Sequence, residues 1–142
     1  MSTRQRKVLV VGDDESALTF VRSVLEPCCY EVSFASDGSA GAVRARRERP
    51  DLIILDVYTS RHPGLYTLRD LKIDPITKDI PVIMLTGVGK RLGVCCSTQD
   101  LYKHMGTSPD VLLEKPVDPD QLRRISEELI GGGRTEAGPG PQ

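Results

Sequence analysis

Five side chains that can do chemistry follow short apolar runs in this sequence. Asp13 and Asp14 come after a valine-rich run, Asp56 after DLIIL, Thr86 after PVIML and Lys115 after VLLE. Three carboxylates within a few ångströms of one another would repel, and one would become neutral unless a cation lay between them. A small set of carboxylate oxygens favours Mg²⁺, which keeps several of its waters. The residue types therefore predict a magnesium site, provided that the runs end together.

The same residue types fit the transfer of a phosphoryl group. Asp56 can act as the nucleophile, as aspartates do when they form acyl phosphates. The cation would clamp a phosphoryl oxygen. Lys115 would bring positive charge to the incoming oxygens and Thr86 a hydrogen bond. In-line transfer needs mainly positioning and charge neutralisation, which this set provides.

Each residue taken alone also has a plain structural interpretation. Asp13 and Asp14 could cap the helix that follows them, and Asp56 could be an ordinary turn residue at a strand end. Thr86 and Lys115 indicate little singly. The functional interpretation therefore depends on whether all five reach one place in the fold.

The patterning between these residues predicts five strands alternating with five helices. Short apolar runs bounded by turn residues are typical of buried parallel strands, and apolar residues at helical spacing indicate helices. The predicted strands are Lys7–Gly12, Tyr30–Phe34, Asp51–Leu55, Ile80–Leu85 and Val111–Glu114. The predicted helices are one that ends before Pro27, then Ser39–Arg49, Leu65–Ile73, Lys90–Met105 and Asp118–Ile130, with Asp118 as a cap and Pro119 at the first position.

Such alternation predicts the α/β class, with a single doubly wound, five-stranded parallel sheet and helices on both faces. In sheets of this kind the functional site lies beyond the carboxyl ends of the strands. All five residues of interest follow strands, so they are expected at one edge of the sheet.

Four segments, read in order, resemble the receiver domains of response regulators over about residues 6–130: VLVVGDDES, DLIILD, PVIMLTG and LLEKPVDPDQL. The resemblance implies a flavodoxin-like receiver fold and a cis peptide bond before Pro116. It also implies roles for individual residues: a metal-binding pair (Asp13, Asp14), a phosphoacceptor (Asp56), a conformational hydroxyl (Thr86), a phosphate-pairing lysine (Lys115) and a backbone carbonyl that completes the Mg²⁺ site (Tyr58).

The function implied by the resemblance is a two-component signalling switch. A histidine kinase or a histidine phosphotransfer protein would donate the phosphoryl group to Asp56 in a Mg²⁺-dependent reaction, and a protein-interaction surface would change. Such a domain catalyses its own phosphotransfer and dephosphorylation, which leaves open whether it is classed as an enzyme.

Two departures from the family pattern support an alternative, a degenerate receiver that acts as a phosphorylation-independent interaction module. Leu112 stands where the family often has an aromatic switch residue, and the loop after Asp56 is altered, with Ser60 where the family often has a proline. A third interpretation, a nucleotide- or flavin-binding enzyme, needs a phosphate-cradling loop after the first strand. That loop is Gly-Asp-Asp-Glu-Ser here, and its charge would repel phosphate without a metal.

Composition limits the partners. The 142 residues include 19 Lys and Arg against 20 Asp and Glu, for a formal net charge of -1. No strong field draws the chain to nucleic acid or an anionic membrane. No apolar stretch approaches the roughly 20 residues of a membrane helix. We therefore expect a cytoplasmic protein that contacts neither directly.

Residues 1–130 are predicted to form one receiver domain, and residues 131–142, rich in Gly and Pro, a disordered tail. With no second domain after Ile130, the expected output is protein binding or phosphorelay. The downstream protein is not identified, and a homodimer stays open.

Two further groups of residues have simpler expectations. The pairs Cys28–Cys29 and Cys95–Cys96 lack the usual zinc-ligand spacing, so free thiols are expected. The arginines of the second helix are expected to form a solvated face, with partner docking as the alternative; they are Arg44, Arg46, Arg47 and Arg49.

Overall fold

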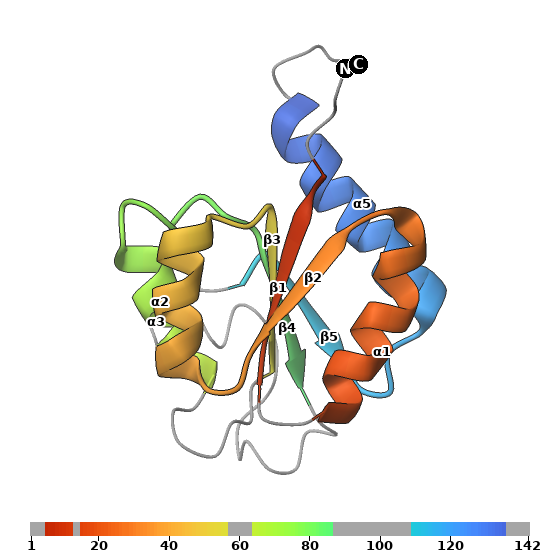
Figure 1. Ribbon diagram of the computed structural model, residues 1–142, viewed down its shortest axis with the longest axis horizontal. Helices are drawn as coiled ribbons and strands as arrows, with labels where there is room; N and C mark the ends of the chain where they lie inside the picture. Colours follow the sequence, from red (N-terminus) through yellow and green to blue (C-terminus); the bar gives the residue numbers. More distant parts are fainter. Residues whose placement is uncertain (1–4, 13–14, 57–63, 87–108, 136–142) are drawn as a thin grey trace.

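The computed structural model describes residues 5–12, 15–56, 64–86 and 109–135. They contain a five-stranded parallel sheet in the order β2-β1-β3-β4-β5 (Figure 1). The strands are β1 (Lys7–Val11), β2 (Glu31–Ala35), β3 (Leu52–Asp56), β4 (Val82–Thr86) and β5 (Val111–Glu114). All five predicted strands are confirmed, with ends that agree or differ by at most two residues.

Helices cover both faces of the sheet, as predicted. Helices α2 (Gly38–Glu48) and α3 (Gly64–Ile73) lie on one face; α1 (Glu15–Leu25) and α5 (Pro119–Thr135) lie on the other (Figure 1). A 3₁₀ turn, η1 (Glu26–Cys28), follows α1. The helix predicted at 90–105 lies outside the described residues.

The strands alternate their side chains between two apolar clusters. In β3, Ile53 and Leu55 belong to the cluster that α2 and α3 cover. Leu52 and Ile54 belong to the cluster that α1 and α5 cover. All four side chains are fully buried, and each such burial contributes about 1.5–3 kcal/mol. The continuous apolar run of β3 is therefore explained by a sheet covered on both faces.

Local side chains fix where two helices begin. Asp37 caps α2, its Oδ1 accepting a hydrogen bond of 2.9 Å from the backbone N–H of Ala40. Asp118 caps α5 in the same way, accepting from the N–H of Gln121 at 2.9 Å, which confirms its predicted role. Within α2, Gly41 lets the helix approach the sheet, because a Cβ there would lie 2.7 Å from Cγ1 of Val11.

Helix α5 is longer than predicted. It continues past Ile130 to Thr135, so the expected disordered tail does not begin at Gly131. Glycine lowers helix propensity, but each residue added to an existing helix also adds a backbone hydrogen bond. Residues 136–142 of the expected tail lie outside the described residues.

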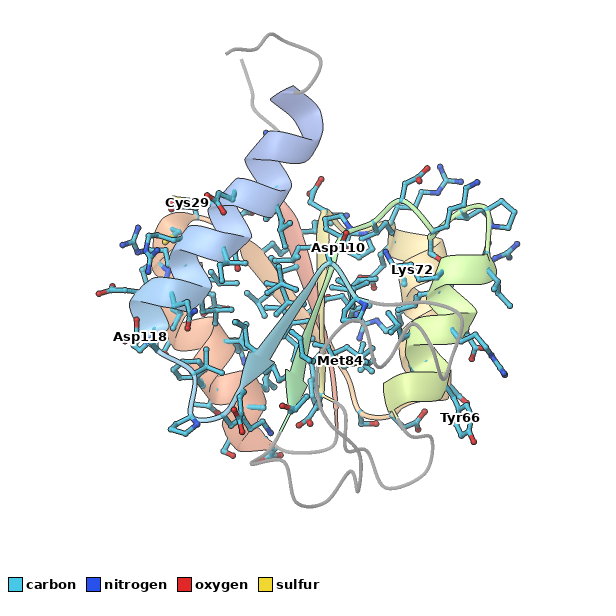
Figure 2. All side chains as sticks on the ribbon, turned by 180° about the vertical axis from the view of Figure 1, so that it is seen from behind. Cys29, Tyr66, Lys72, Met84, Asp110 and Asp118 are labelled. Carbon is cyan, nitrogen blue, oxygen red and sulfur yellow. The ribbon has the colours of Figure 1, made fainter. Side chains whose placement is uncertain are left out.

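Polar contacts tie α3, β4 and β5 together at the amino edge of the sheet. Lys72 donates from Nζ to Asp110 Oδ2 at 3.2 Å and to the carbonyl of Ile80 at 3.3 Å. The same Asp110 oxygen accepts from the N–H of Val82 at 2.8 Å. Figure 2 shows Lys72 and Asp110 on this side of the molecule.

In the part of the chain that the structure describes, no helix is long and apolar enough to cross a membrane. Cys28 and Cys29 are free thiols, as expected, with Cys29 exposed. Cys95 and Cys96 lie outside the described residues.

Candidate functional site

Asp56 is the last residue of β3, at the carboxyl edge of the sheet. Asp56 is only 4% exposed, although it carries an ionisable carboxyl group. On β4 its register partner is Leu85. On the other side Val11 pairs with Leu55, so the chain at Gly12 runs beside Asp56. A carboxylate so placed requires a positive or hydrogen-bonding partner, because burial without one is costly.

Lys115 supplies that positive partner. Its Nζ lies 3.1 Å from Oδ2 of Asp56, within ion-pair and hydrogen-bond range. The backbone N–H of Lys115 donates to the carbonyl of Thr86 at 2.8 Å, which continues the β4–β5 pairing past the end of β5. The strand thus places the ammonium group at the acid. The Lys115–Pro116 peptide bond is cis, as the resemblance implied.

Thr86 is the last residue of β4, the strand next to Asp56, and is 2% exposed. The structure therefore brings Asp56, Thr86 and Lys115 to the same edge of the sheet. These are three of the five residues on whose convergence the sequence interpretation depended. The predicted strand ends were slightly early, since Asp56 and Thr86 close their strands rather than follow them.

Gly12 is a residue of the site whose role the sequence reasoning missed. A Cβ built on it would lie 3.0 Å from Cβ of Asp56. Its N–H donates to the carbonyl of Ala35 at 3.0 Å, so the glycine is held in place beside the acid. The sequence feature that could have indicated this role is the position of the glycine between a buried strand and an acidic pair.

The remaining predicted site residues, Asp13, Asp14 and Tyr58, lie outside the described residues. No group of three or more His, Cys, Asp or Glu side chains that could hold a metal occurs among the residues that the structure covers. Asp56 offers hard carboxylate oxygens, and two further acids follow Gly12 directly in the sequence. This donor chemistry fits Mg²⁺.

An apolar cleft of about 240 Å³ opens beside Lys115. It is lined by Ser16, Ala17, Phe20, Leu85, Lys115, Pro116 and Val117. The cleft thus lies between α1 and the turn that leads into α5.

Comparison with known proteins gives the class to which this fold and site correspond. Residues 8–127 match the response regulator receiver domain family, so the chain belongs to that family. It is 34% identical over 112 residues to the response regulator PleD of Caulobacter vibrioides, and 38% identical over 125 residues to the alkaline phosphatase synthesis transcriptional regulatory protein PhoP of Bacillus subtilis. These alignments cover 79% and 88% of this chain but 23% and 48% of the relatives, so the chain spans at most about half of their length.

Solved structures confirm the fold. The receiver domain of the sensor histidine kinase PA1611 from Pseudomonas aeruginosa superposes with a TM-score of 0.75 at 23% identity. The match covers 90% of this chain and 99% of that one, whose structure has a magnesium ion coordinated in its active site cleft. The chain is therefore a receiver domain of the kind used in two-component signalling, and its fold is the predicted flavodoxin-like one.

Proposed function

We propose that this domain accepts a phosphoryl group on Asp56, in a Mg²⁺-dependent reaction, from a histidine kinase or a histidine phosphotransfer protein. The observation that carries the proposal is the buried carboxyl group of Asp56 with the Lys115 ammonium 3.1 Å away. Membership of the receiver family supports it.

The residues divide the chemistry as follows. An oxygen of Asp56 attacks the phosphorus, the donor's P–N bond breaks, and the histidine nitrogen keeps the electron pair and takes a proton. The Lys115 ammonium pairs with the carboxylate before transfer and with the phosphoryl oxygens after it. The Thr86 hydroxyl donates a hydrogen bond to one of those phosphoryl oxygens. Burial keeps water away from the new acyl phosphate.

Mg²⁺ would be held by Asp13, Asp14, Asp56 and the backbone carbonyl of Tyr58. When bound it supplies charge neutralisation for the attacking carboxylate and the incoming oxygens. The PA1611 receiver, with its magnesium ion, supports this assignment by analogy of fold. The cleft beside Lys115 offers the donor protein an apolar contact next to the acceptor.

Phosphorylation replaces the single negative charge of the Asp56 carboxylate with a phosphoryl group that carries about −1.5 to −2 charges near neutral pH, and we infer that this shifts a protein-interaction surface. Leu112 is half-buried and packs against the core cluster on the α2–α3 side. Because position 112 has no aromatic ring that could reorient on phosphorylation, the conformational change must reach the interaction surface through other residues. The degenerate alternative is not favoured, because Asp56, Thr86 and Lys115 converge on one edge.

The test compares the chain with its Asp56→Asn variant in Mg²⁺ and acetyl phosphate, read by intact-protein mass spectrometry. We expect a gain of one phosphoryl group in the parent, none in the variant, and none when the metal is chelated. Asp79→Asn, which changes an exposed acid, is the matched control and should be phosphorylated like the parent. Phosphorylation of Asp56→Asn to the same extent would contradict the assignment.

A further inference from the structure

Large hydrophobic side chains are exposed at only three described positions, and all three are on α2 and α3. They are Val43 at 54%, Tyr66 at 47% and Ile73 at 69% exposure. Within the described ranges, α1 and α5 expose no large hydrophobic residue. Exposed apolar side chains gathered on one part of a surface mark interaction sites more often than scattered ones do.

Helix geometry places these three side chains on the outer surface. In α2 the glycines Gly38 and Gly41 are buried with Ala45 against the sheet, and Val43 lies between the buried turns on the opposite side. In α3 Leu68 and Leu71 face the core. Tyr66 and Ile73, seven residues apart, share the far side. Figure 2 shows Tyr66 pointing away from the body of the molecule on α3.

The two helices form a continuous surface. They pack against each other, and Arg46 of α2 joins Asp74, the residue after α3, through an ion pair of 2.8 Å. We call the outer side of these two helices, with Val43, Tyr66 and Ile73, the α2–α3 surface.

This surface is basic in a chain that is slightly acidic. Helices α2 and α3 contain five basic residues and two acidic ones, whereas the whole chain has a net charge of -1. Three of the five are already in ion pairs, namely Arg44 with Glu48, Arg46 with Asp74 and Lys72 with Asp110, so the excess positive charge rests on the other two. Arg47 and Arg69 are exposed, and neither forms an ion pair with another described residue. The Arg69 guanidinium lies 5.6 Å from the centre of the Tyr66 ring.

We propose that the α2–α3 surface docks an acidic amphipathic helix of a partner protein. The apolar side chains would receive the apolar face of that helix, and Arg47 and Arg69 would pair with its carboxylates at the rim. Tyrosine and arginine are the residue types that dominate binding energy at protein interfaces. A nucleic acid fits less well, because three exposed apolar side chains share these two helices with the arginines.

This inference does not rest on phosphorylation of Asp56, so the test uses the full unphosphorylated chain without Mg²⁺ or a phosphodonor. The probe is a fluorescein-labelled amphipathic helical peptide with leucines on one face and glutamates on the other. A second peptide carries lysines in place of the glutamates. Binding is measured by fluorescence anisotropy.

Two double variants address the two parts of the surface. Val43→Ser with Ile73→Ser removes apolar area, and Arg47→Glu with Arg69→Glu reverses the charge. The matched control, Arg22→Glu with Arg124→Glu, makes the same charge reversal on α1 and α5. Circular dichroism checks that each variant is folded, and phosphorylation by acetyl phosphate checks that the acceptor site is intact.

The proposal predicts that the glutamate peptide binds and the lysine peptide does not. Each α2–α3 double variant should weaken binding about tenfold or more, and the control should leave it unchanged. Equal binding of both peptides, equal loss in the control, or no binding of the glutamate peptide would overturn it. Displacement of the peptide by duplex DNA, or by self-association of the chain at rising concentration, would assign the surface to a different occupant.

Discussion

At the scale of single residues, the site depends on how closely two neighbouring residues, Lys115 and Gly12, approach Asp56. The carboxylate is buried and Lys115 reaches it from the end of β5 at 3.1 Å, while Gly12 passes it without a side chain. Each neighbour can be changed separately. Both changes therefore test the proposed chemistry without deleting the acceptor.

Replacing Lys115 by alanine removes the positive charge beside the acceptor. We expect phosphorylation of Asp56 by acetyl phosphate to slow by about 10²-fold, the usual effect of losing one charge-stabilising donor. Stability should also fall by about 1–3 kcal/mol, because the buried carboxylate of Asp56 loses the ammonium group that lies 3.1 Å from it. Phosphorylation rates and urea unfolding measure the two effects.

Lys78→Ala is the control, since it removes an exposed lysine that precedes the amino end of β4, whereas the site lies at the carboxyl ends of the strands. A Lys115→Ala variant that is phosphorylated as fast as the Lys78→Ala variant would show that the ammonium has no part in the transfer.

Replacing Gly12 by alanine tests the close approach of β1 to the acceptor. The new Cβ would meet Cβ of Asp56 at 3.0 Å, so the carboxylate must shift by a few tenths of an ångström. We expect phosphorylation to slow severalfold, because transfer depends on alignment of the reacting atoms. Gly131→Ala, in open space on α5, is the matched control. It should stabilise the fold by about 0.5–1 kcal/mol and leave the phosphorylation rate unchanged.

At the scale of secondary structure elements, the segment after α3 offers a test by pH. The N–H of Ile76 donates to Asp74 at 2.9 Å, and this hydrogen bond, followed by Arg46, lowers the pKa of Asp74. A lowered folded-state pKa stabilises the fold at pH values above the ordinary pKa of aspartate, which is near 3.9. That contribution is lost as the pH falls through the folded-state pKa.

The expected result is that Asp74→Asn unfolds at lower urea than the parent at neutral pH. The difference should shrink as the pH falls below about 4 and then through the lowered folded-state pKa, where the parent carboxyl group also becomes neutral. Unfolding curves of both proteins across this range supply the measurement. A difference that stays constant with pH would mean that the carboxylate charge contributes nothing.

Elements with strong local signals were predicted well. The β5 bounds, Val111–Glu114, agree with the structure, and the buried strands β3 and β4 stood out as apolar runs. The length of α5 was not predictable, because the three glycines after Ile130 argue locally for a helix end. Helix propensity carries no information on how far an established helix propagates.

For the site, the sequence predicted that Asp56, Thr86 and Lys115 would share one edge, since parallel strands bring their carboxyl ends together. It could not predict that Gly12 nearly touches Asp56, which depends on the register of β1 against β3. Asp13, Asp14 and Tyr58 as Mg²⁺ ligands stay predictions.

At the scale of the whole molecule, the pleat of the sheet puts Asp56 and Thr86 in line with different apolar clusters. Asp56 follows the side-chain alternation of Leu52 and Ile54, which face α1 and α5. Thr86 follows that of Val82 and Met84, which face α2 and α3. The two residues close neighbouring strands in line with different clusters, so the proposed hydrogen bond from the Thr86 hydroxyl to the phosphoryl group would connect the acceptor to the α2–α3 side.

We therefore expect Thr86→Ala to separate acceptance from response. Phosphorylation of Asp56 should continue, slowed by no more than about tenfold, because the variant loses one neutral hydrogen bond. The phosphorylation-dependent change in amide exchange on α2 and α3 should be lost. Hydrogen-exchange mass spectrometry with and without acetyl phosphate measures this change in amide exchange. The control is Thr19→Ala, which changes an exposed threonine of α1. An unchanged exchange response in Thr86→Ala would contradict this role.

The alternation of side chains across the sheet has a consequence for assembly. A protein that delivers the phosphoryl group can sit over the cleft beside Lys115, on the α1 side. A protein that reads the result can sit on α2 and α3, behind the sheet. The phosphodonor protein and the downstream partner would then bind different surfaces of the domain. A ternary complex could form in which Asp56 is phosphorylated while the downstream partner is already bound.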